Sequence, residues 1–215
     1  MGAKAWFAAY YDENARDILA KNPQLDRDAS RRLANQLLLD AKLEEVEDGS
    51  LDFLNPDERE VLVGDYGGIK IVAHQAFNID CLSQLDARWR FPDLGSTIYV
   101  RAMHSVIDWG AFALWKNGDL VRALSVLPDG GVIEDVGPRM PFEAPFWDGT
   151  PALEGDDEED DTYPLPFHPL EFSEAALLEH LGFQFEGYPN DWVCDPFEIP
   201  IMKFRASSKP FWKLW

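Results

Sequence analysis

The sequence predicts a single α+β domain: a mostly antiparallel β-sheet with the N-terminal helices packed on one face. One strand pattern comes first, two helix patterns follow, and a long run of strand pairs joined by short turns comes next. At 215 residues with 46% hydrophobic side chains, the chain is also long enough for one well-packed core. Strands alternating with helices, the order typical of a doubly wound parallel sheet, do not occur.

The N-terminal part predicts a strand and two helices. In residues 3–12, apolar side chains occupy both sides of a period-two pattern, which indicates a strand buried on both faces. Asp12 is the expected N-cap of a short helix that ends at the Asn22–Pro23 step. Apolar residues at helical spacing across 25–38, with Asp26 at the start, predict the second helix.

The middle of the chain reads as a series of hairpins. Residues 60–77 predict two strands about a turn at 65–68, where glycine supplies positive φ angles. Residues 78–91 are expected to form a helical or irregular crossover, and 97–103 another strand. A turn at 128–131 should then lead to a strand at 132–136.

Asn117-Gly118 between two apolar runs is typical of a type I′ hairpin turn. This turn predicts four cross-strand pairs: Lys116 with Asp119, Trp115 with Leu120, Leu114 with Val121, and Phe112 with Ala123. Both faces of the hairpin are apolar, so we expect a central hairpin covered on both sides.

The C-terminal third changes in character. The proline-rich and aromatic segment 138–172 is expected to cover part of the sheet face that the N-terminal helices leave open. Its acidic run 154–161 is predicted to be a mobile surface loop. A helix capped by Ser173 should follow and stop at Gly182. Residues 206–215 form a basic, aromatic tail that is set apart from the domain at 1–205.

The net charge of −20 at pH 7 limits the partners that this protein can have. A surface this acidic repels phosphate backbones, so nucleic acid is not expected as a partner and a basic protein is. No apolar run comes close to the length of about 20 residues that a helix needs to span a bilayer, and no membrane association is expected. Cys81 and Cys194 form no paired motif, which favours two buried thiols in a reducing cytoplasm.

The stretch HSVIDW places His104, Ser105 and Asp108, the residue types of a nucleophilic triad, within five positions. Adjacent side chains of an extended chain point to opposite faces, and triads are normally assembled from distant segments. We therefore interpret residues 104–109 as a turn between two strands, either purely structural or facing a ligand, and assign no catalytic residue.

No metal or cofactor is expected. The four histidines show no spacing typical of ligands, although His74, His104 and Asp65 could meet across neighbouring strands. The acidic run lacks the rigid helix that a magnesium motif requires, and no phosphate-binding glycine motif opens a helix.

Two functions remain open, besides mimicry of nucleic acid, which would need acidic side chains spaced like phosphates along one face. The first is non-catalytic binding of a basic partner protein, with acidic and aromatic contacts from Asp156, Asp157, Glu158, Glu159, Asp160, Asp161, Trp212 and Trp215. In this reading the tail docks on its own domain or serves as a dimerisation arm on a second copy. The alternative is a small-molecule-binding protein or hydrolase-like enzyme with a pocket near the 104–109 turn. That pocket would be lined by Asp65, His104, Asp108, Glu143 and Trp147.

Several stretches carry a family resemblance: AMHSVIDWGAFALW, GDLVRALSVLPDGGVIEDVG, PFEAPFWDG and YPLPFHPLE. They resemble an uncharacterised, mainly actinobacterial family known only as a domain of unknown function. The resemblance spans most of residues 1–187 and is most specific over 102–149. It implies a shared fold and a bacterial, cytoplasmic setting, and it transfers no catalytic residue.

Overall fold

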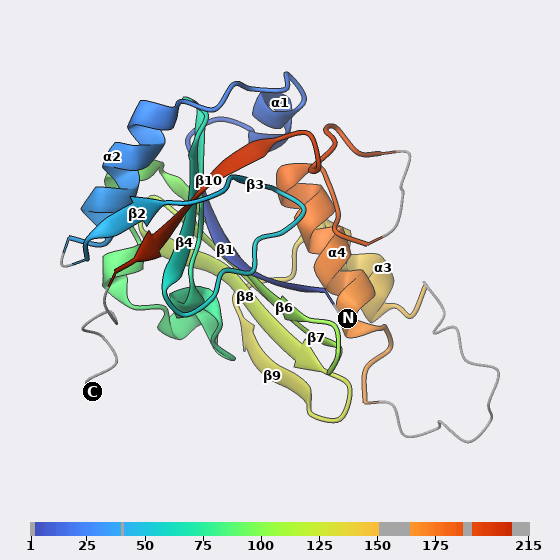
Figure 1. Cartoon of the computed structure of the whole chain (residues 1–215). Coiled ribbons are helices and arrows are strands. Elements are labelled where there is room, and N and C mark those ends of the chain that lie inside the picture. Colours follow the sequence, from blue (N-terminus) through green and yellow to red (C-terminus); the bar gives the residue numbers. More distant parts are fainter. Residues whose placement is uncertain (1–2, 40, 151–163, 187–190, 208–215) are drawn as a thin grey trace.

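The computed structural model describes residues 3–39, 41–150, 164–186 and 191–207 (Figure 1). Within them, ten strands form a sheet: β1 (Lys4–Tyr11), β2 (Leu43–Glu45), β3 (Gly49–Ser50), β4 (Glu60–Asp65), β5 (Ile69–Ala73), β6 (Thr97–His104), β7 (Trp109–Lys116), β8 (Asp119–Leu127), β9 (Gly131–Val136) and β10 (Pro200–Ala206). The helices are α1 (Ala15–Leu19), α2 (Arg27–Leu37), α3 (Ala144–Trp147) and α4 (Pro169–Leu181). Five 3-10 turns complete the elements: η1 (Gln75–Phe77), η2 (Leu82–Gln84), η3 (Ala87–Trp89), η4 (Pro92–Leu94) and η5 (Pro141–Glu143).

Every strand pair in the sheet is antiparallel, so the predicted fold class is confirmed. The order is β2-β10-β4-β5-β1-β6-β7-β8-β9, and β3 pairs with β10 beside this path. The crossover at 78–91 consists of 3-10 turns and irregular backbone, as predicted. None of the helices in the described residues has the length and apolar character needed to cross a membrane.

Strand β10 was not predicted, because no element was assigned to the end of the domain, before the docking tail expected from residue 206 on. Lys203 and Arg205 bind Glu60 on the neighbouring strand β4, at 3.0 and 2.7 Å. Glu60 is almost fully buried, so these ion pairs fix the last strand inside the sheet. Ala206 still belongs to β10 and pairs with Leu43 of β2.

Each face of the sheet is covered by a separate apolar layer. On the α4 face, Phe7 and Phe112 of the sheet pack with Phe172 and Leu177 of α4. On the α2 face, Trp6 and Trp115 of the sheet pack with Leu33 of α2, Phe77 of η1 and Trp89 of η3. Strand β1 contributes to both layers, with odd-numbered residues on one and even-numbered residues on the other. Its predicted burial on both faces is confirmed.

The prediction that the N-terminal helices share one face is wrong. Helix α1 buries Ala15 and Leu19 on the α4 face, whereas α2 buries Leu33 and Ala34 on the α2 face. Leu25, between the two helices, contacts both layers. The connection therefore passes around the end of the sheet. The sequence of a short amphipathic helix does not indicate which face of the sheet the helix covers.

The segment that was expected to cover the face opposite α2 does so in its described parts. Phe146 of α3 contacts Phe167 and Phe172 edge to face, at ring separations of 5.9 and 5.2 Å. All three rings belong to the layer on the α4 face.

Several element ends differ from prediction because an unexpected side chain supplies the cap. Asn14, not Asp12, caps α1, while Asp12 accepts a hydrogen bond from the Ser96 amide. Helix α4 begins at Pro169 with His168 as its cap, so Ser173 lies inside the helix. Proline suits the first helical position because its missing N–H would be unpaired there anyway. The predicted stop at Gly182 is confirmed by its φ of 81°.

The β7–β8 turn has positive φ at Asn117 and Gly118, as a type I′ turn requires, but the predicted register is only partly right. Lys116 pairs with Asp119 and Trp115 with Leu120, as expected. A bulge then pairs Leu114 with Arg122 and shifts the rest of the hairpin by one residue, so that Phe112 pairs with Leu124. The alternation of apolar residues in the sequence does not reveal the extra residue in β8. Because of the bulge, Arg122 points to the α4 face.

Candidate functional site

The HSVIDW segment is a turn, as predicted, and it links β6 to β7. The His104 Nδ1 atom accepts a hydrogen bond from the Val106 amide at 3.2 Å, and the Ser105 amide donates to the Ala3 carbonyl. Asp108 adopts a φ of 50° and its carboxylate lies 3.9 Å from His168 Nε2. In the described residues no hydrogen bond joins Ser105, His104 and Asp108 into a relay. The Val106 amide therefore occupies His104 Nδ1, the nitrogen through which a triad histidine is held by its carboxylate.

Asp65 lies far from His104 and Asp108, with which it was predicted to line a pocket. Along β1, Tyr10 lies opposite both Lys70 of β5 and Ile98 of β6, and Lys70 is itself paired with Asp65. His104 is therefore six residues further along β6 from the row of Asp65, or roughly 20 Å. Asp65 binds the Gly67 amide in its own turn. Strand pairing thus places Asp65 and the 104–109 turn at opposite ends of the sheet.

Glu143 and Trp147 do lie together, around a buried arginine. The Glu143 carboxylate accepts two hydrogen bonds from the Arg122 guanidinium at 2.8 Å each, and a third from Trp147 Nε1 at 3.2 Å. Neither Arg122 nor Glu143 is exposed. Burial opposes the charge on Arg122, but the hydrogen bonds that it donates to Glu143 and Asp135 outweigh this effect and raise the pKa of that guanidinium. This cluster joins β8 and β9 to η5, which is a structural role.

A second buried arginine, also not foreseen, holds α4 to the sheet. Arg101 on β6 donates to the Ser173 carbonyl at 2.9 Å and forms an ion pair with Glu174. The other Glu174 oxygen accepts from the Phe185 amide, and the Phe185 ring lies 5.2 Å from the guanidinium. In the sequence, Arg101 and Arg122 each stand out as a charged residue within an apolar strand pattern, which was the available sign of a buried ion pair. Their pairing partners come from distant segments, so sequence alone could not identify them.

The residues considered for a metal site are also separated. His74 is buried, its Nδ1 accepts from the Ala76 amide, and its ring stacks on Trp89 at 4.6 Å. Burial lowers the pKa of His74 to about 3. Across the described ranges, no three His, Cys, Asp or Glu side chains are grouped so that they could hold a metal ion.

The two cysteines are free thiols, and both are partly exposed where burial was expected. Burial raises the pKa of Cys194 to about 11, with Asp195 adding to the effect. The pKa of Cys81 is also raised, by desolvation and by the charges of Glu134 and Asp80. Thiolate, the reactive form, is scarce at neutral pH for both.

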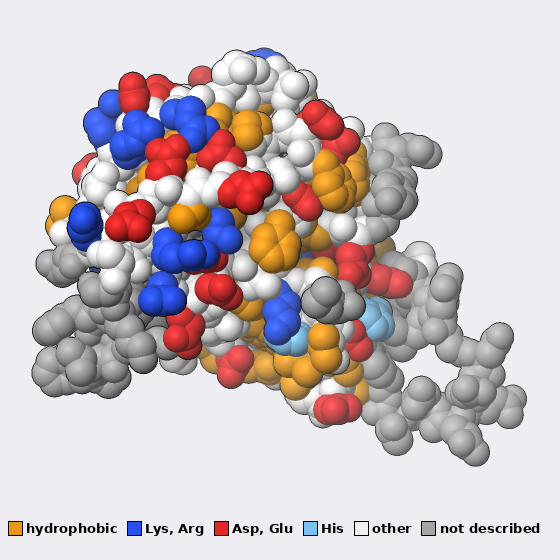
Figure 2. All heavy atoms as spheres, viewed as in Figure 1, with side chains coloured by type: hydrophobic (Ala, Val, Ile, Leu, Met, Phe, Trp, Pro, Cys, Tyr) orange, Lys and Arg blue, Asp and Glu red, His pale blue; other side chains and the backbone are white. Residues whose placement is uncertain are grey.

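The accessible feature at the 104–109 end of the sheet is the free edge of β9. It is the last strand in the sheet order, and none of the described strands pairs with its outer side. Val132, Ile133 and Val136 are 42%, 38% and 39% exposed on this six-residue strand. The turn at 104–109 adds exposed Val106 and Ile107. Figure 2 shows hydrophobic side chains gathered along the lower margin of the molecule, where Figure 1 places β8 and β9. We call these five residues the β9 patch. The patch lies on both sides of the edge strand, because Val132 pairs with Val126 of the α4 layer and Val136 with Ala123 of the α2 layer.

The other edge of the sheet is protected. Strand β2 has only three residues, and its Glu45 is bound to Arg27 and Arg31 of α2. Short, charged edge strands discourage pairing with another chain. In β9 a bulge leaves Ile133 without an opposite residue, which limits regular pairing to the segment after it.

The acidic character of the surface persists around these features. Six basic side chains bind acids across elements: Arg27, Arg31, Arg101, Arg122, Lys203 and Arg205. Acidic side chains still outnumber basic ones in the described residues. The predicted partner-binding residues Asp156, Asp157, Glu158, Glu159, Asp160, Asp161, Trp212 and Trp215 lie outside the described residues, as do most of the predicted tail and the whole acidic run.

Comparison with known proteins identifies the family. Residues 5–204 match a family described as a family of unknown function, DUF6928, so the chain belongs to that family. The resemblance inferred from the sequence motifs is thereby confirmed at the level of a domain of unknown function. No curated protein and no solved structure matches the chain.

Proposed function

We propose that this member of the DUF6928 family is a non-catalytic binding protein whose partner is a basic protein, and that an extended segment of the partner lies along β9. The single observation that carries the proposal is the β9 patch, an apolar free edge on a strongly acidic domain. Free sheet edges bind extended peptides through backbone hydrogen bonds, and side-chain pockets add specificity.

Charge decides between two possible occupants of this edge. A second copy of the chain would bring another net charge of −20 to the contact. A basic segment is attracted by the same field, and the attraction raises its association rate. The bulge at Ile133 limits backbone pairing with any added strand to the residues after it, while Val132 and Ile133 stay open to side-chain contacts.

The setting in which this partner is met stays as predicted from the sequence, a bacterial cytoplasm. The free thiols of Cys81 and Cys194 are compatible with a reducing compartment. The acidic run 154–161 adds seven carboxylates to the attraction of a basic partner.

Binding of a defined peptide tests the proposal. The probe is a labelled twelve-residue peptide in which lysine alternates with valine, and its affinity for the full chain is measured by fluorescence anisotropy. We expect saturable binding that weakens about fivefold or more between 50 and 300 mM salt. A peptide with glutamate in place of lysine should not bind.

Two matched variants locate the contact. Ile133→Lys and Leu39→Lys each replace one exposed apolar side chain by lysine, so both change the net charge equally. Leu39 lies beyond α2, away from β9. Ile133→Lys should weaken peptide binding at least about tenfold, since it removes an apolar contact and repels the lysines. Leu39→Lys should stay within about twofold. Equal weakening by both variants, or by neither, refutes binding at β9.

A further inference from the structure

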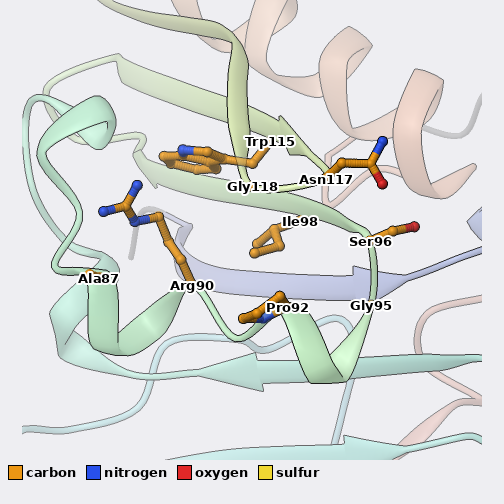
Figure 3. A pocket seen from close by; sticks show the side chains of 9 residues that line it. All are labelled: Ala87, Arg90, Pro92, Gly95, Ser96, Ile98, Trp115, Asn117 and Gly118. Atoms are coloured by element: carbon orange, nitrogen blue, oxygen red, sulfur yellow. The ribbon is translucent and has the colours of Figure 1, made fainter.

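A small cavity at the opposite end of the sheet carries a second, independent inference. It lies between the η3–η4 loop and the ends of β6 and β7 and has a volume of about 150 Å³ (Figure 3). Ile98 and Trp115, both almost fully buried, form its inner wall on the α2 face. Ala87 and Pro92 contribute from the loop.

The size and lining of this cavity limit what it can hold. Sites for drug-sized ligands usually measure about 300 Å³ or more, whereas a cavity of about 150 Å³ accepts a single six-membered ring. Indole, isoleucine and proline side chains present apolar surface, and the Trp115 indole offers a planar group for stacking. The shape therefore suits one ring or a short branched chain.

Arg90 gives the cavity its charge. Figure 3 shows its side chain extending from the loop toward the side of the cavity at which Trp115 lies. Its Nε atom is buried without a hydrogen-bond partner, and no ion pair of Arg90 forms within the described part of the chain. Arg90 is only half-buried, whereas the fully buried Arg101 and Arg122 each bind a carboxylate, and Arg101 Nε also lacks a hydrogen-bond partner. A buried donor without a partner is costly, and a bound anion would satisfy it.

We propose that this cavity binds a small monoanion, an aromatic or short branched carboxylate, whose carboxylate pairs with Arg90 and whose apolar part lies against Trp115 and Ile98. One unpaired arginine balances one negative charge. Anions of higher charge would be repelled by the net charge of −20, so phosphate esters and dicarboxylates are disfavoured. A bidentate pair with the planar guanidinium suits a carboxylate in particular.

Titration of the full chain with benzoate, followed by calorimetry or ligand-observed NMR, tests this proposal. Benzoate has the size of one ring and should bind with a Kd on the order of 1 mM. Benzyl alcohol, the uncharged analogue, should bind at least about tenfold more weakly, because a hydrogen bond to a charged group is lost.

Two arginines in the same loop supply a matched pair of variants. Arg90→Gln removes the charge at the cavity, and benzoate binding should weaken at least about tenfold. Arg88→Gln removes the same charge from an exposed side chain that pairs with Asp86, and binding should stay within about twofold. Ala87→Leu, at an exposed cavity residue, should block benzoate sterically while Arg90 remains.

Three results would overturn the proposal: no saturable benzoate binding by the unaltered chain, equal binding by Arg90→Gln, or equal weakening by Arg88→Gln. Benzoate binding should be unchanged in Ile133→Lys, so failure of this proposal and failure of partner binding at β9 are distinguishable.

Discussion

His180 makes the fold sensitive to acid in a way that one substitution should remove. It lies in the last turn of α4, where its ring contacts Tyr99 at a centroid separation of 4.7 Å and Phe142 at 6.0 Å. Its Nε2 atom is buried without a partner. Burial, with a smaller contribution from the Lys116 charge, lowers the pKa of His180 to about 4. A helix C-terminus normally favours a positive charge, but the apolar surroundings outweigh that preference here.

The sign and size of the effect follow from linkage between protonation and folding. The unfolded chain takes up a proton below its usual pKa of about 6.5, whereas the folded chain resists protonation down to about pH 4. The fold therefore loses stability as pH falls from about 6.5 to about 4. At pH 5 the loss from this residue is about 2 kcal/mol, and it depends little on the folded pKa as long as that value stays near 4 or below.

The variant His180→Phe replaces the buried imidazole by a ring that suits the aromatic cluster. Urea unfolding, followed by circular dichroism, would be measured at pH 7 and pH 5 for both proteins. The stability lost between these two pH values should be about 2 kcal/mol smaller in the variant. Phe142→Leu, which changes the same cluster without a titrating group, should lower stability equally at both pH values. If His180→Phe and the unaltered chain lose the same stability within about 0.5 kcal/mol, the reasoning is refuted.

Three further predictions concern the buried ion pair, the acidic run and the tail. Glu143→Gln leaves the buried Arg122 with only Asp135 as a charged partner and should cost about 3 kcal/mol of unfolding free energy at pH 7; a loss below 1 kcal/mol would contradict this. Replacing the seven acids of 154–161 by their amides should slow association of the lysine–valine peptide at least about threefold at 50 mM salt, in stopped-flow measurements, and hardly at 500 mM. An unchanged rate at low salt would exclude the acidic run from partner attraction. Truncation after Ser207, which leaves β10 complete, should lower the melting temperature or change the oligomeric state if the tail docks, and the absence of both changes would show that it does not.

Local patterns in the sequence predicted the sheet because each depends on residues close together. Asn117-Gly118 defines its own turn, and the alternation along β1 reports burial on two faces without reference to any partner. Gly182 likewise ends its helix by its own conformation. For such features the physics that fixes the structure lies within a few residues.

The errors arose where the deciding contact is distant in sequence. Lys203 and Arg205 gave no sign of a strand because their partner, Glu60, is far away in the sequence, and Arg122 could not be assigned before the bulge in β8 was known. Asp65 was grouped with His104 and Asp108 for the same reason. The turns at 65–68 and 104–109 lie at opposite ends of the sheet, because the direction of the strands alternates along the chain.

Backbone amide hydrogen exchange gives the most direct test of partner binding at β9. Exchange of the full chain would be followed with and without a saturating amount of the lysine–valine peptide. We expect slower exchange within β9, chiefly over residues 134–136 after the bulge, because outward amides there gain hydrogen bonds. Protection that falls elsewhere, or that leaves β9 unchanged while the peptide is bound, would contradict the proposal that this edge is the binding site.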